Sequence, residues 1–313
     1  MPRLGCFTKI IIAIFVVLAL VIVGGLFFPV PEPHVVLPAD AIFSIGGFPI
    51  TNTLLASWLA ILVLVAMFYF GTRKMKLIPR GWQNAIEAVY EGLYNFVEGA
   101  AGEKHARLFF PVVATIFLYV IMAALLSLLP GFDTIGMGYY GEQEGAFFGS
   151  YHGWIVDEPL LRKANTDINF PLALAVISFI FVEYVGIRAL GLRRYGSKFF
   201  QVGQLSHGLG QLVRGKFRAA LSGLFTGLID MFVGSLELLS EFIRIISFTF
   251  RLFGNMTAGM VLLLMVAFLI PWVVAVPFYG LEMLLGFLQA LIFGGLTLIF
   301  AVMAVKPHEG ELE

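Results

Sequence analysis

Five stretches without a charged side chain constrain this chain of 313 residues more than any other feature. Each is longer than the roughly 20 residues with which a helix crosses a hydrocarbon core about 30 Å thick. They cover residues 10–31, 41–72, 108–132, 252–281 and 283–305. Only 13% of all residues are charged, against about 25% in an ordinary soluble domain. The chain is therefore predicted to be an all-α polytopic membrane protein, and its formal net charge of zero argues against nucleic-acid binding.

The loops differ in charge, which predicts their orientation. Seven Lys or Arg and no acid lie in 188–218, and four more basic residues lie in 71–80. In contrast, five acidic residues stand against two basic ones in 131–166. By the positive-inside rule the first two segments face the cytoplasm, whereas 131–166 lies outside. About six membrane-embedded helices are then expected near 10–29, 50–71, 107–130, 168–190, 226–264 and 271–305, with both termini in the cytoplasm.

The N-terminal apolar run allows two interpretations. Arg3 and Lys9 in front of it are typical of a signal peptide, but the nearest small-x-small site, Ala39-Asp40-Ala41, lies about ten residues beyond it. An uncleaved anchor is favoured. Residues 1–48 are thus expected to form a membrane anchor and an external linker, and residues 49–313 the main domain.

Segment 82–98 has a different pattern from the crossings. Apolar residues such as Ile86 and Val97 fall on one helical face, and Asn84 and Glu87 fall on another. The segment is too polar to span a bilayer. It is predicted to be an amphipathic helix along the cytoplasmic interface.

A single arginine, Arg251, precedes thirty residues without a charge. A guanidinium stays charged in a protein and costs about 2.5 to 3.5 kcal/mol at membrane depth, so a residue of this kind is usually functional. The alternative is that Arg251 ends an ordinary helix over about 252–270 and that its side chain reaches the interface.

Other polar residues share a helical face with Arg251. Glu237, Glu241, Arg244 and Arg251 have relative positions 0, 4, 7 and 14, which places them on one side of a helix. The first three can form a local ion-pair cluster, which leaves Arg251 without an acid on its own helix. On the next crossing Glu282 and Gln289 also share a face. A carboxyl at that depth is a candidate proton carrier, although a protonated side chain packed by chance is the alternative.

The interruption at Ile270-Pro271 predicts a long, tilted C-terminal helical hairpin, because proline lacks the amide that continues a helix. Residues whose numbers sum to about 540 then face each other. Arg251 is expected opposite Gln289, and 258–260 opposite Glu282. The fifth helix, with about 39 residues, would be about 58 Å long and would have to tilt or bend.

The string Arg251-Leu252-Phe253-Gly254-Asn255-Met256, with Ala258-Gly259 behind it and Leu288-Gln289-Ala290 on the next helix, resembles subunit a of the F-type ATP synthase membrane sector. The likeness extends over nearly the whole chain from about residue 45. It implies a stator subunit, without cofactor or metal, that carries protons through two half-channels to and from the carboxylates of a rotating c-ring. It also implies peripheral stalk subunit b as a partner and a prokaryotic plasma membrane as the location.

The resemblance also implies roles for individual residues. Arg251 matches the family's essential arginine, which prevents a direct leak between the two half-channels. Asn255 and Gln289 match the polar residues near it, and Glu237 matches the acid of the inner route, for which Glu241 is a substitute one turn away.

The chain departs from the family pattern at two positions. Met260 stands where many bacterial members have a glutamate, and Glu282 stands where they often have a histidine. Glu282 is therefore predicted to carry the outer route, unless Asp167 or Glu183 assists. Glu183 has no counterpart in the family pattern. The choice between protons and sodium stays open because the ion-binding site belongs to the ring.

Two other function classes also place charges inside a membrane. A secondary transporter or a channel acting on its own commonly has inverted repeats or paired broken helices, and neither is visible in this sequence. An intramembrane enzyme is disfavoured because no His-x-x-x-His, Gly-x-Ser-x-Gly or Gly-x-x-x-x-Gly-Lys string occurs. A non-catalytic, ion-translocating subunit is the favoured interpretation.

Overall fold

The computed structural model describes residues 38–129, 131–145, 149–192, 195–196, 217–269 and 275–305, with a few positions between 12 and 23. The predicted anchor helix at 10–29 lies largely outside the described residues. The chain divides into two compact units. The first unit comprises 1–74, 118–170 and 252–291, and the second comprises 75–117, 171–251 and 292–313.

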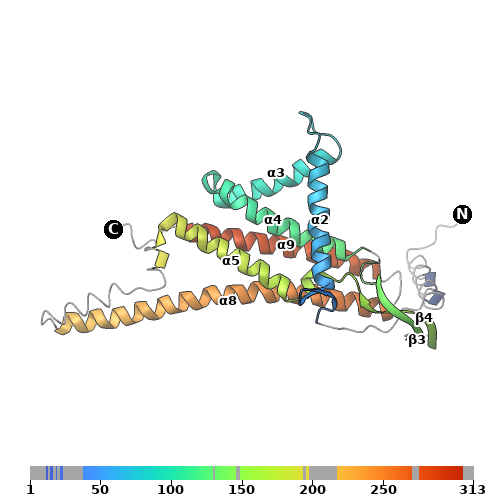
Figure 1. The fold of residues 1–313 in the computed structure, drawn as a ribbon. Helices are drawn as coiled ribbons and strands as arrows, with labels where there is room; N and C mark the ends of the chain where they lie inside the picture. Colours follow the sequence, from blue (N-terminus) through green and yellow to red (C-terminus); the bar gives the residue numbers. More distant parts are fainter. Residues whose placement is uncertain are drawn as a thin grey trace. The chain divides into compact units, whose positions relative to one another are not determined.

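Five long apolar helices form the main part of the fold (Figure 1). Each is long and apolar enough to cross a membrane. They are α2 (Asn52–Thr72), α4 (Glu103–Ser127), α5 (Asn169–Leu190), α8 (Phe217–Leu269) and α9 (Ala275–Val305). These helices match the second to sixth predicted crossings, so the prediction of an all-α polytopic membrane protein is confirmed.

A short hairpin leads into the first of these helices. Strand β1 (Ala41–Ile45) pairs antiparallel with β2 (Phe48–Thr51). Gly46 and Gly47 between them have φ angles of 59° and 87°, a region that glycine adopts without a steric cost. Helix α2 starts directly after Thr51, whose hydroxyl accepts a hydrogen bond from the Leu54 N–H at 3.3 Å. This contact satisfies one of the free amides at the helix N-terminus.

The predicted amphipathic helix is present as α3 (Trp82–Ala101). Glycines with positive φ, Gly81 and Gly102, flank it at its two ends. Val97 of α3 is fully buried in the core of the second unit, where it joins residues from α4, α5 and α9. This core consists of Val97, Ala106, Phe109, Val113, Val182, Val185, Leu298, Ala301 and Ala304. The location of α3 at a membrane interface stays a prediction.

The segment 131–166, predicted to lie outside the membrane, contains a second hairpin. Strands β3 (Gly136–Gly145) and β4 (Gly149–Pro159) pair antiparallel. Gly136 permits the close pairing at the open end, because a Cβ atom there would lie 2.3 Å from the Glu158 carbonyl oxygen. The hairpin is followed by the 3₁₀ turn η1 (Ala164–Thr166), which leads into α5.

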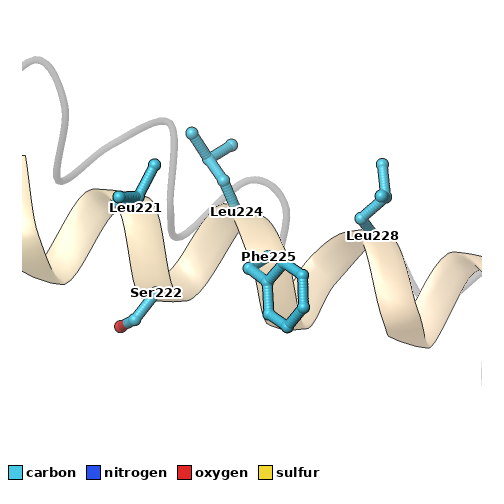
Figure 2. A pocket seen from close by; sticks show the side chains of 5 residues that line it. All are labelled: Leu221, Ser222, Leu224, Phe225 and Leu228. Atoms are coloured by element: carbon cyan, nitrogen blue, oxygen red, sulfur yellow. The ribbon is translucent and has the colours of Figure 1, made fainter.

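Helix α8 has 53 residues and is therefore about 80 Å long, longer than predicted. The prediction placed this crossing at 226–264, but a helix can continue beyond the depth of the membrane. Figure 2 shows Leu221, Leu224 and Leu228 projecting from the same side of its N-terminal part. Leu221, Phe225 and Leu228 are exposed, as expected of a helix that contacts lipid or another subunit.

Candidate functional site

A buried ion pair joins Lys163 to Glu282 in the first unit. Lys163 immediately precedes η1, and Glu282 lies in α9. The Lys163 ammonium donates to Oε1 of Glu282, and the two side chains are only 5% and 7% exposed. Two buried charges are tolerated when they compensate each other, since either alone would be costly. The other carboxylate oxygen of Glu282, Oε2, is buried without a hydrogen-bond partner among the described residues.

Gly259 of α8 makes room for the Glu282 carboxyl group. A Cβ atom at position 259 would lie 3.0 Å from Cδ of Glu282 and 3.1 Å from Oε2. The carboxyl group can therefore pack directly against the backbone of α8. This contact confirms the predicted opposition of 258–260 and Glu282. Met260, next to Gly259, is buried.

Asp133 lies close enough to this ion pair to be affected by its charges. Burial raises the pKa of the Asp133 carboxyl to about 6. The positive charges of Lys163 and Arg162 lower it, and the negative charge of Glu282 raises it. Oδ1 of Asp133 is buried and has no hydrogen-bond partner within the described ranges. We call Asp133, Arg162, Lys163 and Glu282 the Lys163 cluster.

Asp167 makes contacts that are typical of a structural residue. Its Oδ2 accepts a hydrogen bond from the Thr53 hydroxyl at 3.0 Å, which links the start of α2 to this segment. Its Oδ1 accepts from the Asn169 backbone N–H at 3.1 Å and from the Asn169 amide at 2.9 Å. Asp167 thus caps the first turn of α5.

Asn255 and Gln289 are brought together by the hairpin of α8 and α9. The Asn255 amide donates to Oε1 of Gln289 at 2.9 Å. Gln289 is 1% exposed, and its Nε2 has no partner among the described residues. Both residues were predicted to be polar neighbours of Arg251, which lies one helical turn before Asn255. The pairing of Arg251 itself with Gln289 is not tested by a described contact and stays a prediction.

Arg251 is half-buried in the second unit. Its Nη2 donates a long hydrogen bond of 3.5 Å to the Ser247 hydroxyl, one turn earlier. Its guanidinium carbon lies 5.9 Å from the centre of the Phe248 ring. Arg251 forms no ion pair with a described residue.

A second arginine on the same helix is neutralised locally. Arg244 pairs with Glu241 at 2.6 Å, and its guanidinium carbon lies 3.6 Å from the centre of the Phe300 ring. The predicted ion-pair cluster is thus confirmed for Glu241 and Arg244. Glu237 is half-buried one turn before Glu241. The positive charge at position 244 is compensated within the second unit, in contrast to the charge at position 251.

Glu183 of α5 contacts a tyrosine that the sequence did not single out. Burial raises the pKa of the Tyr195 phenol, and Glu183 raises it further through its charge and a side-chain hydrogen bond. Glu241 and Arg244 also act on Tyr195 by their charges. The tyrosine ring packs over Gly186, where a Cβ atom would lie 2.4 Å from the ring. Tyr195 lies outside the crossings, so its sequence position carried no signal of this contact.

Lys163 and Asp133 were also missed as site residues. Both lie in a segment whose charges were used only to predict orientation, and Lys163 is 119 residues from Glu282 in the sequence. No spacing rule relates residues at such a separation. Within the described ranges, no group of three or more His, Cys, Asp or Glu could hold a metal ion.

Comparison with known proteins agrees with the resemblance seen in the sequence. The family described as "ATP synthase A chain" matches residues 54–301. A protein named ATP synthase subunit a from Nitratiruptor sp. is 31% identical over 82% of this chain and 90% of its own length. Proteins of the same name from Helicobacter pylori (strain P12) and Moorella thermoacetica are 28% and 27% identical, over 86% and 85% of this chain and 98% and 96% of their own lengths. The chain therefore belongs to the ATP synthase A chain family.

Proposed function

We propose that this chain is the stator ion-channel subunit of an ATP synthase, with two aqueous half-channels that carry protons to and from the carboxylates of a rotating c-ring. Family membership makes the chain a multi-pass subunit of the ATP synthase membrane sector. We further propose that a c-ring faces Arg251 and that a peripheral stalk subunit b holds the chain in place.

The contrast between the two arginines of α8 carries the proposal. Arg244 is neutralised by Glu241 and covered by Phe300. Arg251 lies seven residues further along the helix, where it makes a long hydrogen bond to Ser247, lies near the Phe248 ring and forms no ion pair with a described residue. An arginine at membrane depth that pairs with no acid in the described part of the chain is suited to a carboxylate supplied by a neighbouring subunit.

The mechanism follows from the charge of Arg251. A fixed cation favours the ionised form of a ring carboxyl next to it, so each acid releases its proton as it passes Arg251. Where the ring faces lipid, a charged carboxylate is costly and the acid stays protonated. A proton therefore has to travel with the ring between the two half-channels. The membrane potential supplies about 2.3 kcal/mol per charge for each 100 mV.

Glu282 is assigned to the outer route and Glu237 to the inner route, with Glu241 one turn away as its substitute. The contact of Glu183 with Tyr195, in the loop predicted to be cytoplasmic, supports a place for Glu183 on the inner side. Asp167 contributes by positioning α2 and α5. We assign the chain to a prokaryotic plasma membrane, in keeping with its relatives from Helicobacter, Moorella and Nitratiruptor. Both termini are assigned to the cytoplasm from the distribution of basic residues among the loops.

The test is ATP synthesis by the whole complex reconstituted in vesicles. Arg251→Ala should abolish coupled synthesis while the complex stays assembled, and proton leak should persist or increase. Arg80→Ala, at an exposed arginine, is the matched control and should behave as the wild type. Wild-type synthesis by Arg251→Ala would refute the proposal, and solute transport by the isolated chain would favour a secondary transporter instead.

A further inference from the structure

The proposed function gives no role to Lys163, which is buried, or to Asp133, which is half-buried. Lys163 holds one oxygen of Glu282, and Asp133 lies within range of the charges of both. Neither residue belongs to the string that identified the family. Both lie in the first unit together with Glu282.

We propose that Lys163 and Asp133 complete the outer proton route, with Asp133 as the group that takes protons from the external water and Lys163 as the residue that holds the Glu282 carboxyl group in place. The inference rests on the proposed function, because it assigns Glu282 to the outer route. Lys163 is a positioning residue that acts through Glu282.

The two oxygens of Glu282 have different surroundings, and this difference supports the division of roles. Oε1 is occupied by the Lys163 ammonium. Oε2 is buried beside Gly259, without a hydrogen-bond partner among the described residues. A proton can be accepted at Oε2 while the ammonium remains in contact with Oε1. The protonated Glu282 then passes the proton to a ring carboxylate, and Lys163 again compensates the charge that returns to Glu282.

Asp133 has the properties of a group that both takes and releases protons. Its Oδ1 is buried without a hydrogen-bond partner among the described residues, so this oxygen is available to take up a proton. Burial also raises the pKa of the carboxyl to about 6, so that both its protonation states are populated near that pH. The charged groups that act on it are Lys163, Arg162 and Glu282. Asp167 is less suited to this step, because both its oxygens already accept hydrogen bonds from Thr53 and Asn169.

A purely structural ion pair is the competing explanation. A double variant in which both side chains are neutral separates this explanation from a role in proton transfer. Lys163→Gln alone leaves a buried carboxylate without compensation, so a loss of assembly would not be informative. Lys163→Gln combined with Glu282→Gln removes both charges and leaves no uncompensated one. If the pair is only structural, this double variant should synthesise ATP at the wild-type rate.

The experiment measures ATP synthesis by the reconstituted complex while the pH of the outer compartment is varied at a constant total driving force. We expect Lys163→Arg to stay near the wild-type rate. The double neutral variant should assemble, as judged by copurification of the other subunits. It should synthesise ATP at about one tenth of the wild-type rate or below. Lys104→Gln, at an exposed lysine, is the matched control and should leave the rate unchanged.

The pH profile tests Asp133 separately. In the wild type, synthesis should decline as the outer pH rises past about 6, because fewer Asp133 carboxyls hold a proton. In Asp133→Asn this decline should be absent. A profile that keeps the decline would overturn the role of Asp133.

The remaining outcomes are equally decisive. A wild-type rate in the double neutral variant would overturn the role of Lys163, because neither charge would then be needed. Arg251→Ala is measured in parallel to separate the two levels of inference. If Arg251→Ala still blocks coupled synthesis while the Lys163 variants behave as the wild type, the further inference and the place of Glu282 on the outer route both fail, but the proposed stator role of the chain stands. If Arg251→Ala synthesises normally, the proposed function itself fails.

Discussion

Gly286→Ala should separate two helices of the first unit and destabilise the protein. Gly286 of α9 faces Ala124 of α4, and a Cβ atom at position 286 would lie only 2.8 Å from the Ala124 Cβ. Non-bonded carbon atoms prefer about 3.5 to 4.0 Å. The two backbones would therefore have to move apart by about 1 Å.

The expected cost follows from two opposing contributions. Overpacking of a close contact costs about 1 to 3 kcal/mol. Replacing glycine by alanine in a helix returns up to about 1 kcal/mol, because alanine has the higher helix propensity. The net free energy of unfolding should thus fall by about 1 to 2 kcal/mol.

Gly280→Ala is the matched control on the same helix. A Cβ atom at position 280 would have no atom within 4 Å, so only the gain in helix propensity remains. Thermal unfolding of the full-length protein in detergent should give a lower midpoint for Gly286→Ala and an equal or higher midpoint for Gly280→Ala. Equal midpoints in the two variants would show that α4 and α9 do not approach each other at Gly286.

The other predictions concern polar groups of the site. Asn255→Ala removes the described hydrogen-bond partner of the buried Gln289, so it should lower the free energy of unfolding by about 1 to 3 kcal/mol, measured by thermal unfolding, and it should also slow ATP synthesis. Burial raises the pKa of Asp133 from 3.8 to about 6. Because the folded state binds a proton at Asp133 more tightly than the unfolded state, the protein is more stable at low pH, and this gain in stability is lost as the pH rises through 6. Asp133→Asn should therefore raise the unfolding midpoint at pH 8 and change it little at pH 4; an equal rise at both would contradict the assignment. Glu282→Gln should slow ATP synthesis in vesicles strongly and Glu237→Gln less, and an unchanged rate in Glu282→Gln would exclude it as a relay.

The crossings could be predicted because a long uncharged segment has few alternatives to a helix in a bilayer, where every backbone amide needs an internal partner. The first and last residues of α8 were harder to predict, because a helix of 53 residues extends beyond what the thickness of a membrane requires. The hairpin of β3 and β4 was missed because its many glycines hide the alternation of a strand. At Gly136 the glycine reflects a close backbone approach, which only the paired structure reveals.

The register of the C-terminal hairpin could be predicted from the interruption at Ile270-Pro271. Placing the turn there gave pairs whose numbers sum to about 540, and Gly259 packs against the Glu282 carboxyl group as this register predicts. Gln289 accepts a hydrogen bond from Asn255, one turn beyond Arg251 on α8. The pairing of Arg251 itself with Gln289 stays a prediction.

The charge at position 282 becomes understandable only together with Lys163. The resemblance described above implies a histidine at this position in many family members, and a protonated histidine beside a buried ammonium would bring two positive charges together. A carboxylate at 282 compensates Lys163 instead, and Lys163 in turn makes a buried carboxylate tolerable. Each of the two buried charges is therefore tolerated because of the other. Sequence analysis could single out only Glu282, because Lys163 lies 119 residues away in a segment where charged residues are normally solvated.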